Sequence, residues 1–171
     1  MGFLTTSRIK SPWVVHYDCG GCNGCDIEVV ASLTPLYDLE RFGILNIGNP
    51  KHADILLVTG TVNYRNKRVL RNLYEQMPEP RLVVAIGACA LTGGIFHNAP
   101  NTICGVDKII PVDIYVPGCP PKPEAIIDGV VMALRFFASR HSDSEPFASC
   151  HSEGEKRPKN LTQDRLKENG K

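Results

Sequence analysis

Four of the seven cysteines have positions that suit a metal centre built from thiolates. Cys22 and Cys25 form a Cys-x-x-Cys pair, whereas Cys89 and Cys119 stand singly, far along the chain. Four soft sulfur ligands suit either zinc or an iron–sulfur cluster. Zinc sites usually combine two local pairs of ligands, and only one local pair is present here. Single ligands from distant segments fit better around a cluster, which is several ångströms across, so the spacing predicts an iron–sulfur cluster.

The other three cysteines need separate interpretations. Cys19 lies three residues before Cys22, so the spacing alone permits a Cys19/Cys22 pair in place of Cys22/Cys25. Cys104 stands in a predicted loop, residues 91–105, that is rich in Gly, Asn and Pro, and we expect a thiol that binds no metal. Cys150 lies in a polar stretch near the end of the chain and is predicted to be free.

Alternating strands and helices must position these cysteines. Short, nearly continuous apolar runs are typical of strands buried on both faces, and apolar residues at helical spacing predict the helices. The predicted strands are 13–17, 54–58, 82–86 and 112–116, with a short extended stretch at 43–47, and the predicted helices are 26–33, 66–77 and 123–140. This order predicts an α/β fold with a mainly parallel sheet flanked by helices.

The predicted strands explain how the cysteines could meet. Cys22 and Cys25 follow the first strand, Cys89 follows the strand that begins at Leu82, and Cys119 follows the strand that begins at Val112. Loops at the carboxyl ends of parallel strands share one edge of the sheet. The sequence therefore predicts that three distant segments deliver four thiolates to one place.

Composition narrows the classes of protein. With 171 residues the chain suits one domain, predicted over 1–141, followed by a polar tail over 142–171 that is disordered or docked on a partner. A net charge of +1 gives no reason to expect nucleic-acid binding. The odd number of cysteines and the absence of a signal peptide predict a soluble, intracellular protein. No stretch is apolar enough to predict a membrane span, so any membrane association would come through partners.

Three motifs give the chain a family resemblance. The segments Cys22–Glu28 (CNGCDIE), Gly87–Ala90 (GACA) and Pro117–Pro121 (PGCPP) resemble the small subunit of energy-converting, membrane-bound nickel–iron hydrogenases. They also resemble the subunit of respiratory complex I that carries the terminal cluster next to quinone. The likeness spans about residues 12–140. Complex I subunits place two cysteines side by side at the first site, so the spacing here favours the hydrogenase side.

The resemblance implies a cofactor and a set of partners. It implies a flavodoxin-like core that has exchanged flavin for one 4Fe–4S cluster, held by Cys22, Cys25, Cys89 and Cys119, with Cys19 as an extra thiol. The family's cluster is proximal to a catalytic site on a large subunit and receives electrons through a ferredoxin-like cluster subunit. Membrane subunits would hold the chain peripherally at the cytoplasmic face of an ion-translocating complex. Related complexes without nickel–iron reduce sulfur compounds or quinone instead.

Three other polar residues, Glu28, His16 and His97, each allow two interpretations. Glu28 follows Cys25 by three residues and could couple protons to the cluster, as family carboxylates do, or serve only as an acid favoured by the helix dipole. His16 and His97 could form a hydrogen bond to a cluster sulfur or to a partner, or be structural. Two other classes also remain open from the sequence: a zinc-stabilised structural protein and a flavoprotein.

Overall fold

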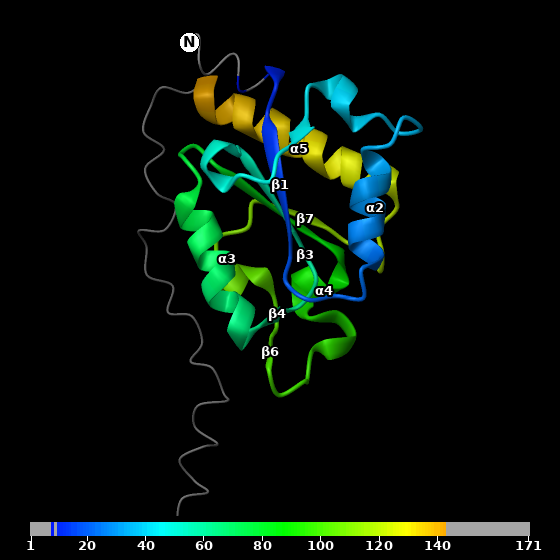
Figure 1. Cartoon of the computed structure of the whole chain (residues 1–171), viewed down its shortest axis with the longest axis vertical. Helices are drawn as coiled ribbons and strands as arrows, with labels where there is room; N and C mark the ends of the chain where they lie inside the picture. The colour runs from blue at the N-terminus through cyan, green and yellow to red at the C-terminus, as the bar shows by residue number, and fades with distance from the viewer. Residues whose placement is uncertain (1–7, 9, 143–171) are drawn as a thin grey trace, which may run out of the picture.

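A five-stranded parallel sheet forms the centre of the computed structural model, which describes residues 8 and 10–142 (Figure 1). The strands are β1 (Trp13–Asp18), β2 (Leu45–Asn46), β3 (Ile55–Thr59), β5 (Leu82–Ile86) and β7 (Ile114–Val116). Their order across the sheet is β2-β1-β3-β5-β7, and every pair is parallel. This is the flavodoxin-like order, with the switch point between β1 and β3. The predicted fold class is confirmed.

The two central strands show why the sequence folds into this sheet. All five residues of β3 and all five of β5 are buried, because helices cover both faces of the sheet there. β2, at one edge, has two exposed residues and pairs only with β1. The apolar runs in the sequence therefore mark the middle of the sheet and leave its edges weakly marked.

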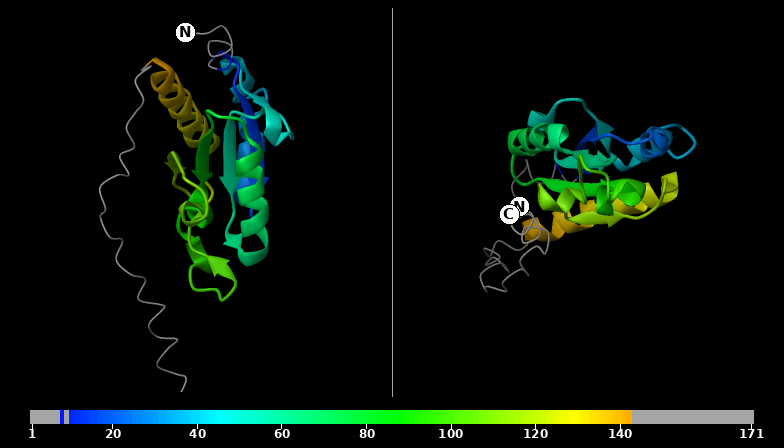
Figure 2. Two further views of the ribbon diagram at one scale, coloured as in Figure 1. Left: turned by 90° about the vertical axis from the view of Figure 1, so that its left-hand side faces the viewer. Right: turned by 90° about the horizontal axis from the view of Figure 1, so that it is seen from below.

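Three main helices divide between the two faces. α2 (Gly24–Ser32) and α5 (Pro123–Ser142) lie on one face, and α3 (Tyr64–Gln76) lies on the other, as Figures 1 and 2 show. The core is correspondingly split into two clusters. One contains Val29 of α2 and Ile126 of α5, and the other contains Leu70 of α3.

α5 is amphipathic along its length. Ile126, Val130 and Ala133 recur at helical spacing and are fully buried, whereas Met132 and Phe136 are exposed. Pro123 is its first residue, where a missing amide hydrogen costs nothing. Within the described part of the chain, no helix combines the length and the apolar character that crossing a membrane requires. Residues 143–171 lie outside the described residues, so the proposed domain boundary stays a prediction.

The segment from Leu91 to Gly105 contains more structure than the expected loop. A short helix, α4 (Gly87–Thr92), directly follows β5 and carries Cys89. Farther on, β6 (Thr102–Ile103) pairs antiparallel with β4 (Val62–Asn63). Neither element leaves a readable pattern in sequence, because six residues make too short a helical period and a two-residue strand depends on a distant partner.

Truncation of a buried side chain of α5 tests the packing. Ile126→Ala should lower the free energy of unfolding by about 2–5 kcal/mol, because it leaves a cavity between α5 and the sheet. The matched control on the same helix is Met132→Ala, whose side chain is 59% exposed and whose loss should cost less than about 0.5 kcal/mol. Denaturant titrations followed by circular dichroism measure both, and equal losses would contradict the assignment of Ile126 to the core.

Candidate metal centre

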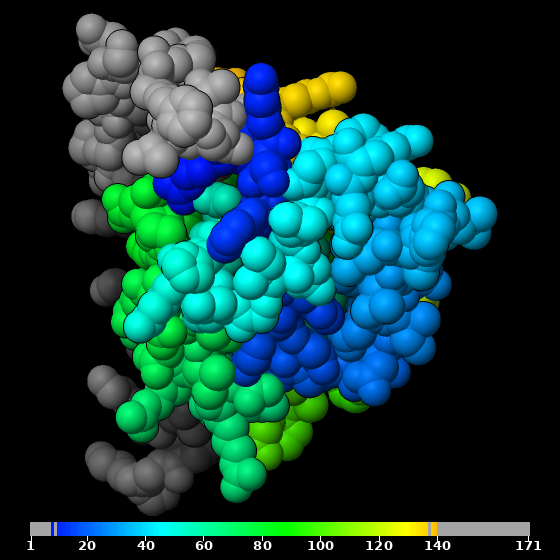
Figure 3. All heavy atoms as spheres, turned by 45° about the horizontal axis from the view of Figure 1, so that its top comes forward, coloured from blue at the N-terminus to red at the C-terminus, as the bar shows by residue number. Residues whose placement is uncertain are grey.

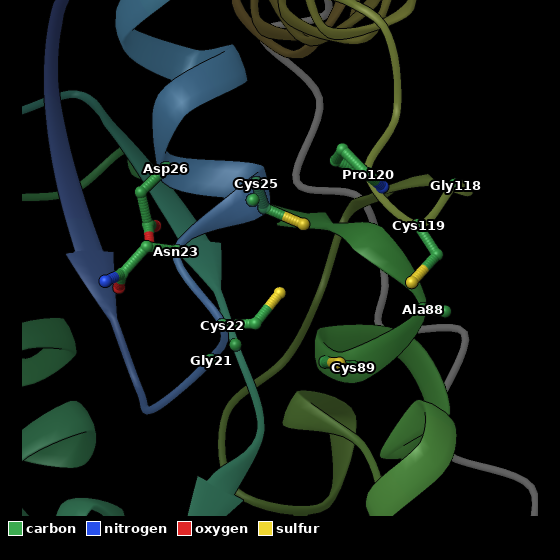
Figure 4. A pocket seen from close by; sticks show the side chains of 12 residues that line it. Gly21, Cys22, Asn23, Cys25, Asp26, Ala88, Cys89, Gly118, Cys119 and Pro120 are labelled. Atoms are coloured by element: carbon green, nitrogen blue, oxygen red, sulfur yellow. The ribbon is translucent and has the colours of Figure 1, made fainter.

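A pocket at the carboxyl edge of the sheet brings together Cys22, Cys25, Cys89 and Cys119 (Figure 4). Each strand that ends there contributes a segment. The lining comes from residues 21–26 after β1, Gly60 after β3, Ala88 and Cys89 of α4 after β5, and residues 118–120 after β7. The expected meeting of the three cysteine segments is therefore what the structure shows, although their role as ligands stays a prediction.

The four thiols surround the pocket from different sides. In Figure 4 the sulfurs of Cys22, Cys25 and Cys119 point toward the space between their segments, and Cys89 lies on α4 below them. Cys22 and Cys119 are exposed, whereas Cys25 and Cys89 are half-buried. Among the described residues, no group of three or more His, Cys, Asp or Glu side chains is arranged to hold a single metal ion.

The electrostatics of Cys25 reflect the crowding of these groups. Burial, and after it the neighbouring charges of Cys89 and Asp26, raise the pKa of the Cys25 thiol to about 11. Cys22 and Cys119 act in the same direction. Thiolates are the form that binds metals, and several of them cannot ionise side by side without a compensating positive charge. The donor set therefore fits a cationic centre made of soft metal ions.

Glycines make room for the sulfurs. A Cβ atom on Gly87 would lie 2.5 Å from Sγ of Cys25, and the backbone there has a φ of +85°, which side chains rarely adopt. A Cβ on Gly94 would lie 3.2 Å from Sγ of Cys89. The amide of Ala88 donates to the carbonyl of Gly118 at 2.8 Å, which joins the Cys89 helix to the Cys119 loop. The backbone is thus shaped around the four thiols.

The other cysteines lie away from the lining. Cys19 is fully buried, burial raises the pKa of its thiol to about 12, and its backbone amide donates to the Thr59 carbonyl at 2.9 Å. Cys104 donates from Sγ to the His97 carbonyl at 2.8 Å. The pocket therefore contains the Cys22/Cys25 pair and not Cys19. Cys150 lies outside the described residues.

A hydrogen-bonded triangle beside the pocket is the feature that the sequence did not reveal. Thr59 donates from Oγ1 to the carboxylate of Asp26, and Nε2 of His16 lies 3.0 Å from both partners. Asp26 also lines the pocket, so this triangle ties the start of α2 to β1 and β3. The one available signal was the position of Asp26 next to Cys25. Residues that meet across three elements leave no spacing pattern in a sequence.

Glu28 and His97, the two remaining candidate residues, do not line the pocket. Glu28 is half-buried on α2 and is not among the residues that line the pocket, so its proposed proton-coupling role stays a prediction. His97 is exposed, and its Nδ1 lies 2.7 Å from the carbonyl of Thr92, the last residue of α4. This contact gives His97 a structural role at the end of the helix that carries Cys89.

Comparison with known proteins places these features in one family. Residues 22–133 match the family described as NADH ubiquinone oxidoreductase, 20 Kd subunit. A probable membrane-bound hydrogenase subunit of Pyrococcus furiosus is 56% identical over 129 residues, which cover 75% of this chain and 77% of that protein. Formate hydrogenlyase subunit 7 of Escherichia coli is 49% identical over 125 residues, which cover 73% of this chain and about half (49%) of that protein.

A solved structure has a similar overall fold. A chain of the membrane-bound sulfane sulfur reductase, an archaeal respiratory membrane complex, superposes with a TM-score of 0.71 at 39% identity. The match covers 82% of this chain and 77% of that chain. Two of these similar proteins are thus named as parts of membrane-bound redox complexes, and the third as a subunit of a formate hydrogenlyase, which agrees with the expected kind of assembly.

Proposed function

Since the chain belongs to the family of the 20 kDa subunit of NADH ubiquinone oxidoreductase, we propose that it carries one 4Fe–4S cluster on Cys22, Cys25, Cys89 and Cys119 and transfers electrons through it. The chain is an oxidoreductase subunit, as its relatives are. The observation that carries the proposal is the meeting of four thiols, from three distant segments, in one pocket at the switch point of the sheet.

The residues of the pocket fit the proposed group. Four cysteine thiolates are the usual ligands of a 4Fe–4S cluster, and such a cluster supplies one-electron transfer when bound. The chain's own contribution is to place Cys22 just before α2, Cys25 in the first turn of α2, Cys89 on α4 and Cys119 after β7. The glycines keep the neighbouring backbone clear of the sulfurs, and the triangle of His16, Asp26 and Thr59 fixes the start of α2.

A partner is needed to complete the site. Two of the four thiols are exposed, and a cluster there would meet water and oxygen. Two exposed apolar side chains flank the ligands along the chain: Ile27, two residues after Cys25, and Ile95, six residues after Cys89, are 66% and 85% exposed. Exposed apolar side chains at a functional edge favour a protein interface. We propose that a large catalytic subunit covers this edge.

We also propose which other subunits the chain works with. The chain would receive electrons through a ferredoxin-like cluster subunit, and membrane subunits would hold it at the cytoplasmic face of the membrane. Proton reduction by a nickel–iron large subunit is one end reaction, since two of the relatives are named for hydrogenase complexes. Sulfur-compound reduction is the second candidate, which the structural likeness to the sulfane sulfur reductase favours. The paired-cysteine nickel motifs of the large subunit, present or missing, decide between them.

Metal analysis tests the cofactor directly. After anaerobic purification we expect a brown protein with about four irons and four sulfides per chain, as one 4Fe–4S cluster requires. A colourless protein with one zinc would contradict the proposal, and so would a yellow flavoprotein without iron. Iron, sulfide and zinc determinations and an absorption spectrum of the same sample distinguish the three.

Serine variants test the ligand set. Cys89→Ser or Cys119→Ser should abolish or destabilise the cluster, because each removes one of the four thiolates. Cys104→Ser and Cys150→Ser should leave the EPR signal of the reduced cluster unchanged. Cys19→Ser should also retain it, since Cys19 lies off the pocket. Loss of the signal in Cys19→Ser, with retention in Cys25→Ser, would support the Cys19/Cys22 pair instead.

Two alanine variants test the glycine cradle. Gly87→Ala would place a Cβ 2.5 Å from Sγ of Cys25, so that ligand must move. We expect cluster loss in the presence of a chelator to become at least about tenfold faster, which corresponds to a modest 1.4 kcal/mol. Gly48→Ala is the control, because a Cβ there meets nothing within 4 Å. The decay of the visible absorption measures the rate of cluster loss. Equal rates in the two variants would show that Gly87 does not shape the site.

A further inference from the structure

The carboxylate of Asp26 lies next to the pocket and is held from two strands. Asp26 follows Cys25 directly and lines the pocket. Thr59 of β3 donates from Oγ1 to Oδ1 of Asp26, and Nε2 of His16 on β1 lies 3.0 Å from the same oxygen. α2 lies at the outer surface of the molecule (Figure 3), yet the side chains of His16 and Asp26 are only 18% and 19% exposed. The charge of this carboxylate is therefore largely shielded from water.

The hydrogen atoms of the triangle follow from its oxygen atoms. The hydroxyl of Thr59 has one hydrogen, and Asp26 accepts it. A carboxylate has no hydrogen to give, so Nε2 of His16, which lies 3.0 Å from both oxygens, must carry a hydrogen and donate. Both donors therefore meet at Oδ1 of Asp26. Within the described part of the chain, Oδ2 forms no hydrogen bond, so the negative charge is only partly compensated.

The start of a helix does not by itself require this arrangement. The dipole of α2 favours an acid in the first turn wherever its side chain points. Asp26 instead receives donors from β1 and β3, while Asn23 supplies no side-chain cap for the same helix. In Figure 4 the side chains of Asp26 and Cys25 leave the start of α2 in different directions. The two strands thus keep the carboxylate beside the pocket and turned away from the sulfur of Cys25.

We propose that Asp26 lowers the reduction potential of the cluster, and that Thr59 and His16 are positioning residues that limit this effect. The inference rests on the proposed function, because it needs the cluster on the four cysteines. Reduction adds one electron from an external reductant and breaks no bond, so a fixed negative charge nearby opposes it. The two donors on Oδ1 weaken the field of that charge and keep the carboxylate from approaching the pocket.

Removal of the charge tests the role of Asp26. The full-length, cluster-loaded chain is titrated with dithionite against redox mediators at about pH 8, well above the ordinary range of carboxyl groups, and the EPR signal is followed. Asp26→Asn keeps the shape and one acceptor oxygen but loses the charge. The ratio of reduced to oxidised cluster at a fixed potential should therefore rise about tenfold, which is about 59 mV for one electron.

The matched control is Asp128→Asn. It makes the same chemical change at an exposed position of α5 that does not line the pocket, so it should leave the potential at the wild-type value. Equal potentials in Asp26→Asn and Asp128→Asn, both with full clusters, would overturn the inference.

Deletion of the Thr59 hydroxyl tests the positioning role. Thr59→Val removes one donor with little change in shape, so the carboxylate acts more strongly and the same ratio should fall by at least about threefold. A clamp that is merely structural gives no reason for shifts of opposite sign in Asp26→Asn and Thr59→Val. Thr59→Ser restores the donor and should restore the wild-type potential. An unchanged or raised potential in Thr59→Val would overturn the positioning role.

Iron and sulfide determinations on every variant distinguish the possible failures. A wild-type chain without iron would overturn the proposed function and this inference together. Full clusters throughout, with an unchanged potential in Asp26→Asn, would overturn this inference and leave the proposed function standing. If Asp26→Asn loses its cluster, Thr59→Val and Thr59→Ser decide the inference by the same criteria.

Discussion

A parallel sheet buried on both faces can bring distant segments together only at its edges, and this constraint governs the whole molecule. The residues of β3 and β5 are buried, so the faces of these strands offer no site that solvent or a ligand can reach. The loops that leave the carboxyl ends of β1, β5 and β7 are therefore the available carriers of chemistry. Each of the four pocket cysteines lies in or directly after one of those loops.

Two kinds of contact shape the loops at this edge of the sheet into the cysteine pocket. One is steric: Gly87 leaves the volume that Sγ of Cys25 occupies, and its positive φ turns the chain from β5 directly into α4. The other is polar. Asp26 binds both Thr59 and His16, so the helix that carries Cys25 is tied to the two strands at the switch point. A cluster would thus sit between elements whose relative positions are already determined by hydrogen bonds.

The sequence predicted the parts of this arrangement that depend on local patterns. Buried strands leave apolar runs, and α5 leaves a helical period, so four strands, the short extended stretch 43–47 that contains β2, and the three main helices could be placed to within a few residues. α4 and the β4–β6 pair were missed because they are short and depend on distant neighbours. The cysteine pocket was predictable because the three cysteine-bearing segments follow strand ends. The triangle of His16, Asp26 and Thr59 was not, since its members share no spacing.

Cys19 shows where spacing stops being informative. Both Cys19/Cys22 and Cys22/Cys25 have the same three-residue separation, so the sequence alone could not choose between them. What distinguishes them is the direction of the chain after β1. The amide of Cys19 still continues the strand by donating to Thr59, and its side chain packs into the core beside Val58 and Val62. β1 ends at Asp18, and only after the turn at Gly20 and Gly21 do Cys22 and Cys25 reach the pocket. A thiol three residues earlier than Cys22 is therefore held beside the end of β3 and is buried in the core, away from the pocket.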